Sequence, residues 1–368
     1  MSYAIEAEDL RKTFTGKREV KALKGVSFRV EEGTVFGLLG PNGSGKTTAV
    51  RVLTTILKPD SGTARVLGHD VTKKGALVRS LIGLAGQYAA VDENLTGREN
   101  LVMVGRLNHL DRSVVTQRAT ELLSQFNLVD AGDRPLKTYS GGMRRRLDLA
   151  AALVARPTVL FLDEPTTGLD PQSRNDLWEV IEQLVEGGTS VLLTTQYLEE
   201  ADRLAKTLVV LDQGRVIAEG TPGELKANLG ATVLEVGLNT VDEAGRTGQL
   251  LAALGSHQPV VSGTLVEVTV DDGAQAAMAG LRSLDEARIR PVTFTLREPS
   301  LDDVFIALTG HKSEEEKEAE SAADNARRKN RRRSDERELA EHLPFSEGPQ
   351  LAEEALGGSG SSSTGDNQ

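Results

Sequence analysis

Cysteine is absent from all 368 residues of the chain, so no disulfide framework of the kind that stabilises small secreted domains can form. Long apolar runs are absent too, because stretches such as residues 158–162 are soon interrupted by charged side chains. A membrane-spanning helix needs roughly 18 consecutive apolar residues, and we expect none here. The first residues lack the basic and apolar regions of a secretory signal. These absences predict a cytoplasmic protein that does not cross a membrane by itself.

Positive charge is in short supply, since 43 Lys and Arg residues face 54 Asp and Glu residues and leave a formal net charge of -11. Proteins that bind DNA or RNA gain much of their affinity from Lys and Arg side chains that neutralise phosphates. We therefore expect no nucleic acid as a main partner. The length of 368 residues suits two domains rather than one.

Residues 1–230 have the pattern of an α/β domain. Alternating apolar and polar residues near the start predict short strands, and nearly continuous apolar runs follow at residues 34–39, 158–162, 190–194 and 208–211. Amphipathic helical segments separate these runs, which predicts a parallel sheet covered by helices on both faces. Residues from about 88 to 150 read as an inserted helical subdomain.

The composition changes after residue 230. Residues 231–311 alternate between short strands and helices, which predicts a small C-terminal α+β domain. Residues 312–368 consist largely of Glu, Lys, Arg, Ser, Ala and Gly and cannot bury enough apolar surface to fold, so we expect a disordered charged tail.

A glycine-rich loop with the pattern GxxxxGK[ST] directly follows the apolar run at 34–39 and precedes a helical segment. Its residues are Gly40, Pro41, Asn42, Gly43, Ser44, Gly45, Lys46 and Thr47, and Thr48 comes next. In such a P-loop, backbone N–H groups and the helix N-terminus surround the phosphates of a nucleotide. Lys46 would reach the β- and γ-phosphates, and the Thr47 hydroxyl would bind Mg²⁺. A plain glycine turn is the alternative, which the position between strand and helix disfavours.

Two acidic residues end the apolar run at 158–162. Asp163 would hold Mg²⁺ through water, and Glu164 would polarise the attacking water as a general base. Alone, such a pair is as often the solvated start of a loop. Together with the P-loop, it predicts nucleotide hydrolysis.

The run Tyr139-Ser140-Gly141-Gly142-Met143 resembles the signature of the ATP-binding cassette (ABC) family, usually LSGGQ. The resemblance implies a P-loop NTPase cassette with a RecA-like parallel sheet core, an antiparallel β subdomain and an inserted helical subdomain. It also implies ATP and Mg²⁺ as ligands. In that family Ser140, Gly141 and Gly142 would close on the γ-phosphate held by a second copy, so the chain is expected to form a head-to-tail homodimer.

Other motifs match the family in order and spacing. Gln87 looks like the Q-loop glutamine, which touches Mg²⁺, and Asp170 lies in a segment that resembles the D-loop. Phe14 sits where an aromatic ring stacks on adenine, although core packing would be the ordinary interpretation without the resemblance. Gln196 replaces the usual switch histidine. A neutral amide can still donate a hydrogen bond to the γ-phosphate but cannot become cationic, so we expect slow hydrolysis.

Residues 91–100, 139–146 and 297–305 are similar to the daunorubicin-resistance type of exporter ATPase. That resemblance implies efflux of a hydrophobic drug through a separate integral-membrane permease of the ABC-2 exporter type, with the ATPase at the cytoplasmic face of the cell membrane. An exporter of lipid or polysaccharide is an alternative, because the permease selects the cargo. A soluble ABC protein that acts on ribosomes or DNA is a second alternative, disfavoured by the single P-loop.

Three further features have competing interpretations. Arg144, Arg145 and Arg146 either bind lipid head groups or, as we expect, pair with acidic residues. The basic residues at 327–333 are a better candidate for anionic lipid, although acidic neighbours favour a solvated segment. Trp178 lies on an amphipathic helical segment and is expected in the core.

Overall fold

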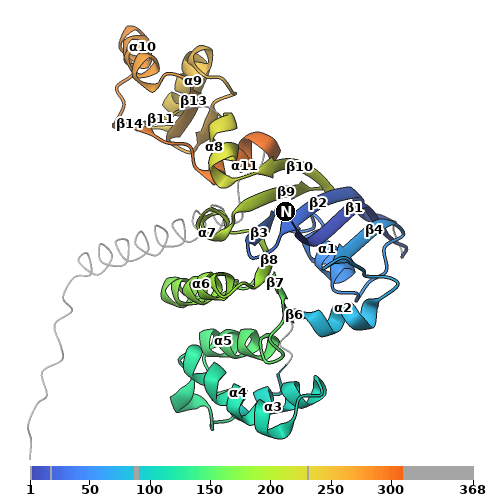
Figure 1. Ribbon diagram of the computed structural model, residues 1–368. Helices are drawn as coiled ribbons and strands as arrows, with labels where there is room; N and C mark the ends of the chain where they lie inside the picture. The colour runs from blue at the N-terminus through green and yellow to red at the C-terminus, as the bar shows by residue number, and fades with distance from the viewer. Residues whose placement is uncertain (1, 17–18, 87–90, 230–231, 310–368) are drawn as a thin grey trace, which may run out of the picture. The chain divides into compact units, whose positions relative to one another are not determined.

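A computed structural model of the chain describes residues 2–16, 19–86, 91–229 and 232–309 (Figure 1). The chain divides into two compact units, residues 1–317 and 318–368, and all described residues belong to the first. Gln87, the tail predicted at 312–368 and its basic residues at 327–333 lie outside the described residues.

The central sheet has six strands in the order β10-β9-β3-β8-β7-β6. All neighbouring pairs from β9 to β6 are parallel, and β10 runs antiparallel to β9. The strands are β3 (Val35–Leu39), β6 (Ile82–Ala85), β7 (Val159–Asp163), β8 (Ser190–Thr195), β9 (Thr207–Asp212) and β10 (Arg215–Gly220). Every residue of β3, β7 and β8 is buried, as expected for parallel strands covered on both faces.

One face of the central sheet packs against a second, antiparallel sheet and two helices. The second sheet has the order β2-β1-β4-β5, with β1 (Tyr3–Phe14), β2 (Val20–Glu31), β4 (Ser61–Val66) and β5 (His69–Asp70). Helices α1 (Lys46–Leu53) and α2 (Gly75–Leu81) contribute to the same core. Phe28 of β2 stacks on Phe36 of β3 with ring centroids 5.1 Å apart. This sheet is the predicted antiparallel β subdomain.

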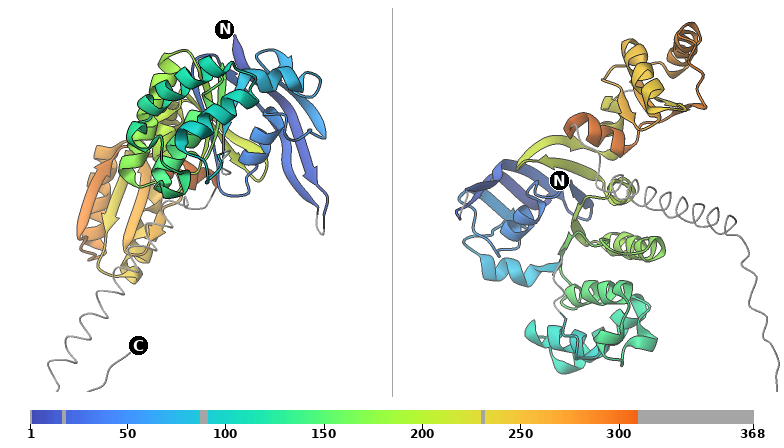
Figure 2. Two further views of the ribbon diagram at one scale, coloured as in Figure 1. Left: turned by 90° about the horizontal axis from the view of Figure 1, so that it is seen from below. Right: turned by 180° about the vertical axis from the view of Figure 1, so that it is seen from behind.

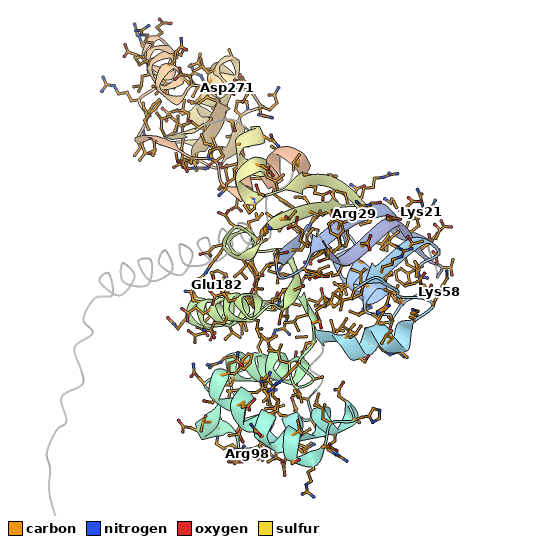
Figure 3. All side chains as sticks on the ribbon, in the orientation of Figure 1. Lys21, Arg29, Lys58, Arg98, Glu182 and Asp271 are labelled. Atoms are coloured by element: carbon orange, nitrogen blue, oxygen red, sulfur yellow. The ribbon has the colours of Figure 1, made fainter. Side chains whose placement is uncertain are left out.

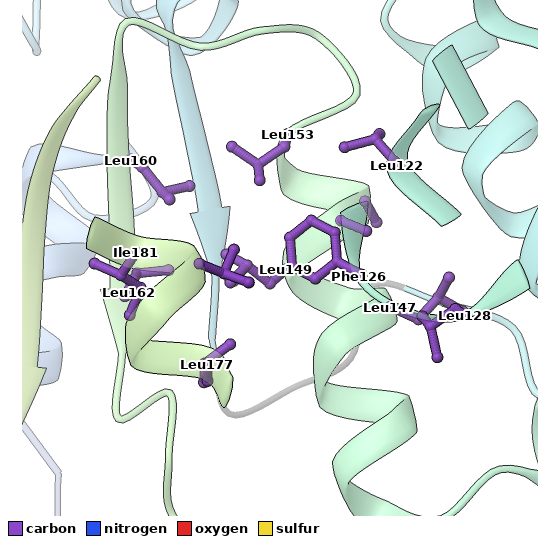
Figure 4. Close-up of a cluster of buried hydrophobic side chains, with 14 of the residues drawn as sticks. Leu122, Phe126, Leu128, Leu147, Leu149, Leu153, Leu160, Leu162, Leu177 and Ile181 are labelled. Atoms are coloured by element: carbon purple, nitrogen blue, oxygen red, sulfur yellow. The ribbon is translucent and has the colours of Figure 1, made fainter. Parts of the chain in front are cut away.

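The other face of the central sheet packs against helices inserted between β6 and β8. They are α3 (Gly97–Leu107), α4 (Arg112–Gln125), α5 (Gly141–Ala152) and α6 (Pro171–Glu186), with short 3₁₀ helices at Val129–Ala131 and Leu136–Thr138. Leu149 of α5 and Leu177 and Ile181 of α6 meet Leu160 and Leu162 of β7 in one buried cluster (Figure 4). Helices α3, α4 and α5 lie side by side in the views of Figures 1 and 2.

The C-terminal part of the described chain is an α+β structure with its own core. Its antiparallel sheet has the order β12-β13-β11-β14 and carries helices α9 and α10. The elements are β11 (Thr232–Gly237), α9 (Val241–Leu251), a 3₁₀ helix (Ala252–Leu254), β12 (Val260–Ser262), β13 (Leu265–Val270), α10 (Gly273–Glu286) and β14 (Thr293–Arg297). The predicted fold class is thus confirmed for the described residues.

The last helix in the described part of the chain, α11 (Leu301–Thr309), packs on two helices that follow central strands, α7 (Leu198–Leu204) and α8 (Pro222–Leu229). Phe305 of α11 is 5 % exposed and shares a buried cluster with Leu198 and Leu225. The sequence pattern did not predict this return of the chain. Of the helices in the described ranges, none combines the length and hydrophobicity that a bilayer crossing requires.

Replacement of Phe305 by Ala should lower the free energy of unfolding by about 3 kcal/mol, because it removes a large side chain from a packed cluster. Urea denaturation followed by far-ultraviolet circular dichroism measures the change. Leu308→Ala is the matched control, since Leu308 lies on the same helix but is 44 % exposed. Its effect should stay within about 0.5 kcal/mol. Equal losses for the two variants would contradict the packing described for α11.

Candidate functional site

The predicted P-loop joins β3 to α1, and its path requires glycine at two positions. Gly45 has φ 111°, in the left-handed region that favours glycine, and immediately precedes α1. A Cβ on Gly40 would lie 2.2 Å from the carbonyl oxygen of Leu211, which is too close for any side chain. The turn after β9 also supports the loop, because Gly214 N donates to Ser44 O at 2.9 Å.

A cavity of about 730 Å³ lies against this loop, within the size range of small-molecule sites. Predicted ATP-binding residues that line it are Phe14, Pro41, Asn42, Gly43, Ser44, Gly45, Lys46, Thr47 and Thr48, and the predicted base Glu164 lines it as well. Lys24, Gln213 and Lys21, which projects from β2 in Figure 3, also line the cavity and were not predicted. They come from strands and turns that the fold, not a local motif, brings to the loop.

Phe14 is the last residue of β1 and is 40 % exposed, so it is not an ordinary core residue. The Lys12 ammonium lies 5.9 Å from the ring centroid. An exposed ring at the rim of the cavity can stack on a flat heterocycle.

Lys46 lies at the centre of the buried part of the site. Its Nζ donates to Gly40 O at 2.6 Å and to Pro41 O at 3.3 Å. The same atom is 3.6 Å from Glu164 Oε1, and the two side chains are only 4 % and 7 % exposed. The cation of the loop therefore faces the carboxylate that follows β7.

Asp163 and Glu164 are held by Thr194 of the neighbouring strand β8. Thr194 Oγ1 donates to Asp163 Oδ1 at 2.6 Å, and Glu164 N donates to Thr194 O and Oγ1, both at 3.1 Å. Thr47 Oγ1 donates to the same Asp163 oxygen at 3.3 Å. Thr194 was missed from the sequence because a buried strand threonine carries no motif of its own.

Two family patterns match the chain: "ABC transporter" at residues 23–167 and "ATP-binding protein DrrA1-3-like, C-terminal domain" at residues 220–309. The daunorubicin/doxorubicin resistance ATP-binding protein DrrA of Streptomyces peucetius is 51% identical over 320 residues, which cover 87% of this chain and 96% of that protein. The chain belongs to the ABC transporter family, among its DrrA-type ATP-binding subunits. Nod factor export ATP-binding protein I of Paraburkholderia xenovorans is 43% identical over 63% of this chain and 76% of that protein.

Solved ABC cassettes share the fold of part of this DrrA-type chain. One cassette in its ADP conformation is 28% identical, with a TM-score of 0.56 over 62% of this chain and 95% of that one. A bacterial cassette solved as a dimer is 25% identical, with a TM-score of 0.55 over 59% of this chain and 98% of that one. The chain is an ATP-hydrolysing subunit, and subunits of this kind dimerise and work with a membrane partner.

Gln196 of the DrrA-type chain directly follows β8, which lies between β3 and β7 in the sheet. Its buried Oε1 has no hydrogen-bond partner among the described residues. Gln196 does not belong to the described lining of the cavity, and neither do Gly40 and Asp163. All three residues lie at the carboxyl ends of the central strands β3, β7 and β8, the same edge of the sheet at which the cavity lies.

The residues predicted for the signature and the D-loop lie at helix starts. The Ser140 hydroxyl accepts from Met143 N at 3.3 Å and caps α5, and Asp170 accepts from Ser173 N at 3.0 Å and caps α6. The hydrogen bonds from Ser173 lower the pKa of Asp170 below its usual range. Gly142 approaches the same serine, since a Cβ there would lie 2.8 Å from Ser173 Oγ.

The described residues that line the cavity include none of Ser140, Gly141, Gly142 and Asp170. Ser140 and Gly141 are exposed instead. The chain thus holds two potential anion sites that do not meet within it.

The arginines after the signature have protein partners. Arg144 pairs with Glu93 at 2.8 Å and Arg145 with Asp148 at 3.6 Å, as predicted. Arg146 Nη1 donates to the Phe126 carbonyl at 3.5 Å.

Glu200 of α7 is a fully buried carboxylic acid beside the site. Trp178 of α6, itself 3 % exposed and in the core as predicted, donates from Nε1 to Glu200 Oε1 at 3.1 Å. Burial raises the pKa of Glu200 above the ordinary value, because desolvation disfavours the charged form. The folded state therefore binds this proton more tightly than the unfolded state does.

This raised pKa has a testable effect on stability. The tighter proton binding of Glu200 in the folded state adds to the free energy of unfolding. This contribution is fully present at a pH below the unfolded-state pKa of Glu200 and is lost as the pH rises through its folded-state pKa. Glu200→Gln removes the titration, so the variant should gain stability relative to the wild type as the pH rises. Urea denaturation between about pH 4 and pH 8 tests this. Glu199→Gln, at an exposed neighbour on α7, is the control, and a pH-independent difference for Glu200→Gln would refute the prediction.

Proposed function

We propose that the chain powers an exporter that removes a hydrophobic drug from the cell through a separate membrane permease. The observation that carries this proposal is the identity of 51% with a daunorubicin/doxorubicin resistance protein over 87% of this chain and 96% of that one. The alignment includes the C-terminal segment, which a general cassette lacks. ATP hydrolysis is common to the family, so the proposal concerns the cargo, a hydrophobic drug.

The substrate is ATP with Mg²⁺. Lys46 would bind the β- and γ-phosphates, and its present carbonyl partners show that its ammonium already points into the loop. Thr47, Asp163 and Gln87 would hold Mg²⁺. The hydroxyl and carboxylate oxygens of Thr47 and Asp163 lie 3.3 Å apart and are the hard ligands that this ion prefers. When bound, Mg²⁺ would neutralise phosphate charge that develops during hydrolysis.

No group of three or more His, Cys, Asp or Glu side chains suited to a metal occurs in the described part of the chain. This fits an ion that takes most of its ligands from phosphate and water.

Glu164 would act as the general base. Its carboxylate would accept a proton from the water that attacks the γ-phosphate, and its buried position near Lys46 supports this role. Gln196 would donate a hydrogen bond from its amide to the γ-phosphate, and its Oε1, which has no partner among the described residues, would be able to accept one from the water. Because Gln196 carries no charge, hydrolysis would be slow.

The functional unit would be a head-to-tail homodimer. Ser140, Gly141 and Gly142 at the start of α5 would contact the γ-phosphate in the partner's P-loop, with Asp170 near the interface. Their absence from the cavity lining of their own chain supports a role in trans, as does the similarity to a cassette solved as a dimer. The ATP sandwiched in each site would then be bound by both copies.

The membrane partner would be a permease of the ABC-2 exporter type, with this chain at the cytoplasmic face of the cell membrane. We also propose three domains: the cassette at residues 1–230 with its helical subdomain at about 88–150, an accessory domain at 231–311 and a charged tail at 312–368. The match of a separate C-terminal family pattern to residues 220–309 supports the second domain.

Another cargo is the second candidate. The similarity to Nod factor export ATP-binding protein I favours it, because one type of cassette then serves exporters of chemically different molecules. The permease would decide between the candidates.

The roles of Glu164 and Gln196 predict different losses of hydrolysis. Glu164→Gln should lower the rate of phosphate release by about 100-fold or more while ATP binding persists, because it removes the base and keeps the shape. Gln196→Ala should lower the rate by about 10- to 100-fold. Glu186→Gln, an exposed change at the end of α6, should leave the rate unchanged. An unchanged rate for Gln196→Ala beside an inactive Glu164→Gln would show that the role given to Gln196 is wrong.

Drug efflux tests the cargo. Cells that express the chain with its permease should lose preloaded doxorubicin faster than cells that express Lys46→Ala with the same permease. The Lys46 variant lacks the cation that would bind the phosphates. If both cells retain the drug equally while the wild-type chain hydrolyses ATP, the ATPase assignment stands and the drug assignment fails.

A further inference from the structure

Arg145 lies on α5, just beyond the signature, and its side chain is 16 % exposed. The guanidinium binds main-chain carbonyls from two other segments of the chain. It donates from Nη1 to Gly86 at 2.6 Å, from Nε to Pro165 at 2.6 Å, and from Nη2 to Glu164 at 2.9 Å and Asp163 at 3.2 Å. One side chain on α5 therefore holds, through hydrogen bonds, both the end of β7 and Gly86, the residue that precedes Gln87.

The segment held in this way contains a disfavoured backbone conformation. Glu164 has φ 51°, in the left-handed region that residues other than glycine rarely adopt. Such a conformation persists only where the surroundings determine it. Thr194 holds the Glu164 N–H from one side of the turn, and Arg145 holds the Glu164 and Pro165 carbonyls from the other.

We propose that Arg145 is a positioning residue for hydrolysis: it fixes the main chain at residues 163–165 so that the Glu164 carboxylate lies against Lys46. Through the same contacts it couples that placement to the helix that carries Ser140. The inference rests on the proposed role of Glu164 as general base. Arg145 does not itself line the cavity but contacts Glu164, which does, so its effect acts through Glu164.

The geometry requires arginine in particular. A guanidinium presents five N–H donors in a rigid plane and can serve several carbonyls in fixed directions. A lysine ammonium is a single point with three donors, and it cannot span the carbonyls of Gly86 and Pro165 while also reaching Glu164. Asp148, 3.6 Å from Nη1, supplies the neighbouring negative charge.

The chain contains a matched control on the same helix. Arg144 is the preceding residue, with an exposed side chain (38 %) that pairs with Glu93 and also donates to the Lys137 carbonyl at 3.2 Å. Arg144→Lys thus makes the same chemical change one position away, without contact to residues 163–165.

The experiment compares Arg145→Lys and Arg145→Gln with Arg144→Lys in the full chain. We measure kcat and KM for ATP by phosphate release, nucleotide binding with a fluorescent ATP analogue, and the thermal unfolding temperature. Both Arg145 variants should lower kcat by about 10- to 100-fold, as expected for a displaced catalytic group, with KM changed less than about twofold. Arg144→Lys should match the wild type. The glutamine variant keeps two N–H donors on its amide. We therefore expect at least one of the two Arg145 variants to keep the wild-type fold.

A double-mutant cycle separates positioning from general structural damage. In the Glu164→Gln background, Arg145→Lys should cause no further loss in single-turnover hydrolysis, because the group that Arg145 positions is already gone. A further loss equal to that in the wild-type background would overturn the inference, as would a wild-type kcat in both Arg145 variants. If Glu164→Gln itself hydrolyses ATP normally, the proposed role of Glu164 as general base is wrong. If only the inference about Arg145 is wrong, Glu164→Gln is inactive and both Arg145 variants hydrolyse ATP at the wild-type rate.

Discussion

Strand β8 pairs with β3 on one side and with β7 on the other, and the whole site depends on this parallel pairing. Leu39 lies opposite Thr195, and Asp163 lies opposite Thr194, so the three strands end level with one another. Parallel strands present their carboxyl ends at one edge of the sheet. The P-loop, Gln196 and Glu164 each directly follow one of these three strands, so they lie next to one another at that edge. The residues are far apart in the sequence, and only the register of these strands brings them together.

The pairing also explains why so many polar groups are buried here. Lys46, Asp163, Glu164 and Thr194 are each less than 9 % exposed, at the carboxyl edge of the central sheet. Buried polar groups are costly unless they have partners, and these groups provide partners for one another. Such a network keeps donors and acceptors oriented before a nucleotide arrives, which reduces the reorganisation needed for catalysis.

The sequence predicted those parts of the site whose signals are local. The P-loop and the acids that end β7 follow from short motifs beside continuous apolar strands, and the nearly complete burial of β3 and β7 explains why that pattern was clear. Strand β4 was missed because only two of its six residues, Ala64 and Val66, are buried. The contacts of Arg145 were missed for another reason. They join residues up to 59 positions apart and involve carbonyl groups, which every residue has.

Trp178 is the only tryptophan of the chain, and its indole hydrogen-bonds Glu200 where α6 meets α7. Helix α6 starts directly after Asp170, and α7 starts two residues after Gln196. Arg203 of α7 also lies over the ring, 5.1 Å from its centroid. The fold has therefore placed a single natural fluorophore between the helices that follow Asp170 and Gln196. Its emission spectrum therefore reports, without an added label, on the surroundings of this one helix contact, with no background from other indoles.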